Sequence, residues 1–87
     1  MAHVFIPALL RPLTGGQEQV QVEGATVRAV IANLDSLYPG IQARLLEDDR
    51  LRPSIAVVVD GEVSRLKLRH KVTEHSEIHF MPALSGG

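Results

Sequence analysis

The sequence predicts a small α+β fold in which one helix packs across one face of a mixed sheet of four or five strands. Three observations carry this prediction. Short runs that contain β-branched and aromatic residues lie near both ends of the chain, and a run of β-branched residues lies past its middle. One stretch, residues 27–38, has apolar residues at helical spacing. The length of 87 residues leaves room for a single core.

Two strands are expected before the helix. Residues 3–10 have extended character, because their first half is rich in β-branched and aromatic side chains. Residues 11–16 contain Pro12 and two glycines and are predicted to form a turn. Residues 17–22 alternate polar and apolar side chains. The first 22 residues therefore predict a hairpin.

The helix has clear start and stop signals. Thr26 is a good N-cap residue, and the Pro39-Gly40 pair ends the apolar stripe. Residues 41–51 are predicted to form a short helical turn or a loop. The acidic residues 47–49 are expected to face solvent there.

The second half of the chain supplies the remaining strands. Residues 55–59 form the strongest strand signal, residues 62–73 are irregular, and residues 77–82 predict the last strand. A hairpin, a helix and two further strands fit the β-grasp arrangement of ubiquitin-like proteins. We therefore expect a β-grasp domain over residues 1–82 and a flexible Gly-Gly tail over residues 83–87.

Composition argues against several classes of function. The formal net charge is −1, no dense basic block is present, and aromatic residues are scarce, so nucleic acid is not expected as a partner. There is no cysteine, which excludes disulfides and thiol catalysis. No apolar run approaches the roughly 20 residues of a membrane helix, and no signal peptide is visible. We expect a cytoplasmic protein without a membrane partner.

Several short motifs together resemble a known family. They are LRPLTGG at residues 10–16, GATV at 24–27, YP at 38–39, VVVDG at 57–61 and FMPALSGG at 80–87. In this order they resemble the MoaD/ThiS-like sulfur carriers, which are β-grasp relatives of ubiquitin. The resemblance spans the whole chain. It departs from the family at the turn of residues 74–76 and in the basic stretch 65–71.

The resemblance implies a carrier protein rather than an enzyme, with Gly87 as its working residue. In the family, an E1-like activating enzyme uses ATP to adenylylate the terminal carboxylate, which then becomes a thiocarboxylate that donates sulfur. The carrier itself binds no cofactor. A free carboxylate is ionised and unreactive at neutral pH, so it must be activated. Gly86 and Gly87 suit this step, because they carry no side chain that would clash in a narrow channel.

Strand parity predicts an apolar docking surface beside the tail. Phe5, Val58 and Met81 have the opposite parity to the expected core residues of their strands, and Leu84 follows in the tail. Exposed apolar residues that cluster in this way commonly mark a partner site. We expect these four residues to contact the activating enzyme and the enzyme that accepts sulfur.

Three classes of function stay open from the sequence. A sulfur carrier would serve either a molybdopterin-synthase large subunit or a cysteine synthase, whereas thiamine-pathway carriers are typically shorter. A ubiquitin-like modifier would use the same tail, although Lys67 and Lys71 are the only lysines for chain building. A β-grasp binding module would leave the tail idle.

The four histidines and the first glycine pair invite other interpretations. His3, His70, His75 and His79 have no ligand spacing typical of a metal site, so exposed histidines are expected and no metal is assigned. Gly15-Gly16 lacks the pattern of a phosphate-binding loop and is interpreted as a turn.

Overall fold

A five-stranded mixed sheet forms the centre of the computed structural model, which describes residues 1–83. The strand order is β2-β1-β7-β5-β6. The β1–β7 pair is parallel, and the other neighbours are antiparallel. The predicted mixed sheet is thereby confirmed, and β7 lies at its centre. The strands are β1 (Ala2–Phe5), β2 (Gln19–Val22), β5 (Ile55–Val59), β6 (Glu62–Val63) and β7 (Glu77–Pro82).

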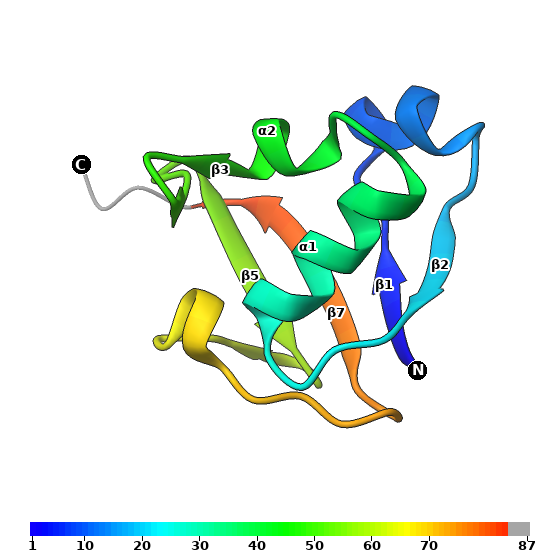
Figure 1. The fold of residues 1–87 in the computed structure, drawn as a ribbon. Coiled ribbons are helices and arrows are strands. Elements are labelled where there is room, and N and C mark those ends of the chain that lie inside the picture. The colour runs from blue at the N-terminus through cyan, green and yellow to red at the C-terminus, as the bar shows by residue number, and fades with distance from the viewer. Residues whose placement is uncertain (84–87) are drawn as a thin grey trace.

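One helix, α1 (Val27–Leu37), crosses a single face of this sheet, as Figure 1 shows. Its N-terminus is capped as predicted, because Thr26 Oγ1 accepts the Ala29 N–H at 3.1 Å. The buried side of the helix packs on the alternate residues of the strands that point toward it. The core contains Val4, Val22, Val27, Val30, Ile31, Leu34, Ile41, Leu45, Val57, Val59, Ile78 and Phe80 among others.

The predicted long first strand is wrong in its second half. Strand β1 ends at Phe5, and a 3₁₀ helix, η1 (Ala8–Thr14), replaces the rest of the strand and the first part of the predicted turn. Gly15 and Gly16 form a turn, as predicted. Pro7 has no N–H with which to continue the sheet, and its carbonyl instead accepts the Leu10 N–H at 2.9 Å. This i→i+3 bond is the pattern of a 3₁₀ helix. Gly15, at φ 64°, then ends the helix.

Residues 41–51 contain a short helix and a hairpin. Helix α2 (Ile41–Leu45) agrees with the prediction, but the hairpin of β3 (Leu46–Glu47) and β4 (Arg50–Leu51) was not expected. Its turn places Asp48 and Asp49 at φ 53° and 62°. A two-residue hairpin turn of this kind usually contains glycine, so the Asp-Asp pair gave no such signal. The acidic run is also paired in part, because Arg28 Nη1 lies 2.7 Å from Asp49 Oδ1.

The segment expected to be irregular, residues 62–73, contains two short elements. Strand β6 is followed by a single 3₁₀ turn, η2 (Lys67–Arg69). Ser64 is buried and accepts the Lys67 N–H at 2.9 Å, and its Oγ lies 2.7 Å from His70 Nδ1. The expectation of an exposed histidine is therefore wrong for His70, which is half-buried. Its hydrogen bond with Ser64 closes this loop.

Candidate functional site

The root of the tail is held by the central strand of the sheet. Strand β7 is paired on both sides, and its register with β5 continues to Pro82, which lies opposite Ile55. The Ala83 N–H then donates to the Ser54 carbonyl at 2.8 Å. The point where the chain leaves the sheet is therefore fixed by backbone hydrogen bonds. Leu84, Gly86 and Gly87, three of the predicted site residues, lie outside the described residues.

The sheet surface opposite α1, called here the open face, carries a row of side chains across four strands. Phe5 and Val58 are both register partners of His79, one from each neighbouring strand. Val63 lies beyond Val58 on β6. The Phe5 and His79 rings are stacked, with centroids 4.1 Å apart and planes 6° apart. The two predicted residues Phe5 and Val58 thus lie in one row on the open face, with His79 between them.

Met81 lies two residues beyond His79 along β7, toward the tail root. Its register partner is Ala56, and its side chain is 51% exposed. Leu9, on η1, is 91% exposed and lines the same groove as Met81. Two exposed apolar side chains therefore flank the point where the tail begins. Their function as partner contacts stays a prediction.

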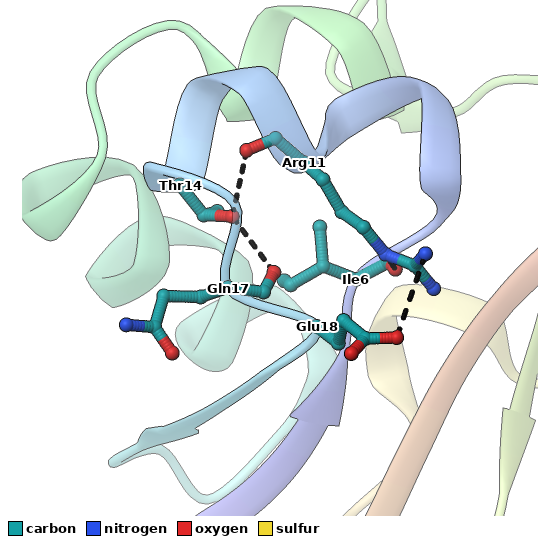
Figure 2. Close-up of polar contacts among 5 residues, drawn as sticks. All are labelled: Ile6, Arg11, Thr14, Gln17 and Glu18. Atoms are coloured by element: carbon teal, nitrogen blue, oxygen red, sulfur yellow. Dashed lines mark hydrogen bonds and ion pairs between the residues drawn. The ribbon is translucent and has the colours of Figure 1, made fainter.

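Polar contacts hold η1 against the sheet and so position Leu9. Figure 2 shows Arg11 reaching from η1 toward Ile6 and Glu18. The Arg11 Nε–H donates to the Ile6 carbonyl at 3.1 Å, and Arg11 Nη1 lies 3.6 Å from Glu18 Oε1. The buried Thr14 hydroxyl lies 3.1 Å from the Arg11 carbonyl and 2.9 Å from the Gln17 carbonyl. The middle and the C-terminal end of the 3₁₀ helix are therefore attached to neighbouring backbone.

A groove of about 710 Å³ joins the open face to the tail root. Phe5 and His79 line one end, while Leu9, Met81 and Pro82 line the other. Arg11 and Glu18 also line it and are already paired with each other. The groove thus offers a mostly apolar surface with one imidazole. Its chemistry suits protein recognition, because an aromatic and a methionine are typical of interface cores.

Sequence reasoning missed His79, Val63 and Leu9. His79 shares the parity of Met81 on β7, so the same alternation rule predicts its side of the sheet. Leu9 carried no usable signal, because its exposure depends on the unexpected 3₁₀ helix. The other histidine near this face, His3, lies opposite Glu77 on β7, and its Nδ1 is 3.1 Å from Gln19 Nε2.

Residues 1–83 bring no three His, Asp or Glu side chains together in a way that would hold a metal ion. On the open face, His79 Nε2 lies 4.0 Å from Glu77 Oε1, and His3 Nδ1 lies 3.1 Å from Gln19 Nε2. The site residues are therefore apolar side chains and backbone around a chain terminus. Such an arrangement offers an apolar surface beside the point where the chain leaves the sheet.

Comparison with protein families identifies the chain. The model of the ThiS family matches residues 4–87, nearly the whole length. This chain belongs to the ThiS family. The match extends over the last strand and through the terminal glycines, so the resemblance seen in the sequence is confirmed.

Individual relatives agree with this ThiS-family assignment. The sulfur carrier protein CysO of Mycobacterium tuberculosis is 35% identical over 97% of this chain and 96% of its own. The structure of CysO from Amycolatopsis orientalis, in its complex with BexX, is 36% identical, has a TM-score of 0.91 and is covered completely, as is this chain. Small archaeal modifier protein 1 of Haloferax volcanii is 27% identical with a TM-score of 0.78, over 99% of this chain and 98% of its own. The ubiquitin-like β-grasp fold is thereby confirmed.

The helices of this ThiS-family chain are short. Over residues 1–83, none has the length and apolar character needed to cross a membrane.

Proposed function

We propose that this protein is a sulfur carrier whose Gly87 carboxylate is converted to a thiocarboxylate for cysteine formation. The observation that carries the proposal is its similarity over almost the full chain to CysO sulfur carriers, up to the terminal glycine pair. The geometry supports it, because the central strand of the sheet leads directly into the tail. The protein acts as a co-substrate and not as a catalyst.

The chemistry has two steps, both on a partner enzyme. The Gly87 carboxylate attacks the α-phosphorus of ATP and forms an acyl-adenylate, and pyrophosphate leaves. Sulfide then attacks the acyl carbon, AMP leaves, and a thiocarboxylate remains. The enzyme that carries out both steps is E1-like. A different enzyme, similar to cysteine synthase, then accepts the sulfur from the thiocarboxylate. The similarity to CysO sulfur carriers favours this acceptor over a molybdopterin-synthase large subunit.

The open face is the surface proposed to contact these enzymes. The tail offers little side-chain area to recognise, since two of its residues are glycines. Recognition therefore needs a surface next to the tail root, and Phe5, Val58 and Met81 provide it together with His79. Leu84 would extend this surface into the tail. Localisation in the cytoplasm, where ATP is available, is part of the same proposal.

The test follows the mass of the intact protein. Incubation with the E1-like enzyme of the same organism, ATP and sulfide should replace one oxygen by sulfur at the terminus. A variant extended by one alanine after Gly87 should fold normally and stay unmodified. One residue moves the reacting end by up to about 3.5 Å, and a misplacement of about 1 Å can cost on the order of 100-fold in rate. Thiocarboxylation of the extended chain at the wild-type rate would contradict the proposal.

A second candidate function is protein modification. The likeness to a small archaeal modifier protein favours it, and both functions share the activated tail. The two are separated in cell extracts, where a carrier gives the thiocarboxylate of the free protein and a modifier gives conjugates of higher mass. If the tail is idle, extracts should contain neither the thiocarboxylate nor the conjugates, and deletion of Gly87 should have no effect.

A further inference from the structure

A second hollow lies at the tail root and differs from the open face. It has a volume of about 370 Å³, and its apolar wall includes Leu45, Ile55 and Phe80. The hollow shares part of its lining with the groove described above, namely Pro7, Leu9, Phe80, Met81 and Pro82. Phe5, Val58 and His79 are not part of its lining. Strand β7 runs up to this end of the sheet, where η1 and α2 lie (Figure 1).

The polar side chains of the hollow are two arginines and a serine. Arg44, exposed near the end of α2, makes no ion pair or side-chain hydrogen bond with any residue from 1 to 83. Arg52 donates from Nη2 to the Ala43 carbonyl at 2.9 Å, and its Nη1 lies 3.7 Å from Glu47. Its buried Nε–H has no acceptor within the described chain. No carboxylate is among the residues that line the hollow.

Two of these donor groups lack an acceptor within residues 1–83: the Arg44 guanidinium and the Arg52 Nε–H. A buried N–H without an acceptor is unfavourable, and a guanidinium group next to apolar surface is well suited to pair with a carboxylate. The hollow therefore combines an apolar wall with one unpaired guanidinium, that of Arg44, at its rim. Its complement is a segment with one apolar side chain and a neighbouring carboxylate.

The position of the arginines indicates who supplies that segment. Pro82, at the tail root, and Arg44 line the same hollow. Four further residues add at most about 14 Å of extended chain, so the partner that binds the terminal carboxylate comes near Arg44. A nucleotide site is positively charged where it holds ATP phosphates, and it repels nearby arginines unless acidic side chains pair with them. We therefore expect acidic side chains at the mouth of the activating enzyme's channel, where they would pair with the arginine.

We propose that the hollow between η1 and α2 receives an acidic segment with an apolar tip from the activating enzyme. This inference rests on the proposed function as a sulfur carrier. The contact orients the domain from the α2 end of the sheet, next to the open face, with which the hollow shares Met81. Arg44 supplies the charge, and Leu9 packs against the apolar tip. The tail root is then held from two sides while the terminal carboxylate reaches the nucleotide.

The test measures ATP–pyrophosphate exchange by the E1-like enzyme of the same organism with the full-length carrier. Arg44→Glu should raise the KM for the carrier at least about tenfold, which is the effect of 1.4 kcal/mol, with kcat unchanged. Arg44→Lys should keep most of the affinity. Leu9→Asp should raise KM as well, and its high exposure allows it to fold. Arg65→Glu makes the same charge change on an exposed residue outside the hollow and should leave KM unchanged.

Salt provides a second measurement. The wild-type KM should rise as ionic strength increases to about 0.15 M, and Arg44→Glu should lose part of this dependence. Normal exchange by the wild type with unchanged KM in Arg44→Glu and Leu9→Asp would overturn this inference alone. No exchange by the wild type would contradict the proposed function itself. Two other results would also overturn the inference. A lower KM in Arg44→Glu would place the chain's own tail in the hollow, and a wild-type dimer that Arg44→Glu disrupts would place a second copy of the chain there.

Discussion

The two faces of the sheet are made from alternate residues of the same strands, yet the exposure of their side chains differs strongly. On the α1 side, Val4, Val57 and Ile78 are buried at 0–1% exposure. On the open face, Phe5 and Val58 are only half-buried, and Met81 is 51% exposed. The inner face is covered by this chain's own helix, whereas the open face has no cover within residues 1–83. The comparison indicates that the inner face serves stability, and it motivates our proposal that the open face serves recognition.

The largest difference between the faces should appear when one residue of β7 is shortened on each side. Ile78→Ala should lower the free energy of unfolding by about 2–5 kcal/mol, because it opens a cavity in the core. Met81→Ala should change it by less than about 0.5 kcal/mol, because the side chain is at the surface. Urea unfolding followed by circular dichroism measures both variants. Equal losses would show that the open face is also part of the stabilising core.

A charge on the open face should separate recognition from stability. Met81→Asp should weaken binding of the activating enzyme by about 1–2 kcal/mol, the scale of a modest hot spot. The melting temperature should change little, since the side chain is half exposed. Calorimetry with the purified activating enzyme gives the binding constant, and Glu62→Asp, on the short edge strand β6, is the control. A large fall in melting temperature would contradict the assignment of Met81 to a docking surface.

The smallest expected effect concerns the stacked pair in the middle of the open face. A double-mutant cycle of Phe5→Leu and His79→Ala should give a coupling energy of about 0.5–1.5 kcal/mol in unfolding. The stacking distance of 4.1 Å supports a direct interaction. Both single variants should also weaken partner binding. A coupling energy of zero would indicate that the two rings contribute to the open face independently.

Much of the fold was predictable because its signals are local. Thr26 announces the start of α1, and the apolar stripe after it selects the buried side. The β-branched run of β5 gives its strand, and alternation along β7 separates Ile78 and Phe80 from Met81. The elements that escaped prediction are η1, the β3–β4 hairpin, and the short elements β6 and η2. The backbones of η1 and the hairpin are set by Pro7 and by a turn at Asp48 and Asp49, residues whose sequence context suggested a strand or a loop.

The site divides along the same line. Three predicted partner residues, Phe5, Val58 and Met81, lie on the open face, because strand parity needs only the identity of the strand. The sequence did not predict that His79 lies between Phe5 and Val58, because these two neighbours come from β1 and β5. Leu9 and Arg44 gave no signal at all. Their proximity to the tail root depends on how η1 and α2 pack at the end of the sheet.

The sequence by itself determined the secondary structure of the main elements, the side of each strand that enters the core, and the resemblance that points to the terminal glycine. These features depend on periodicity and on side-chain chemistry along the chain. Only the tertiary structure decided that β7 lies at the centre of the sheet and that Ala83 is fixed to Ser54. It also decided that Arg44 and Arg52 border an apolar hollow. The reason is physical: strand order and end-to-end packing bring together residues far apart in sequence, and no local pattern encodes that contact.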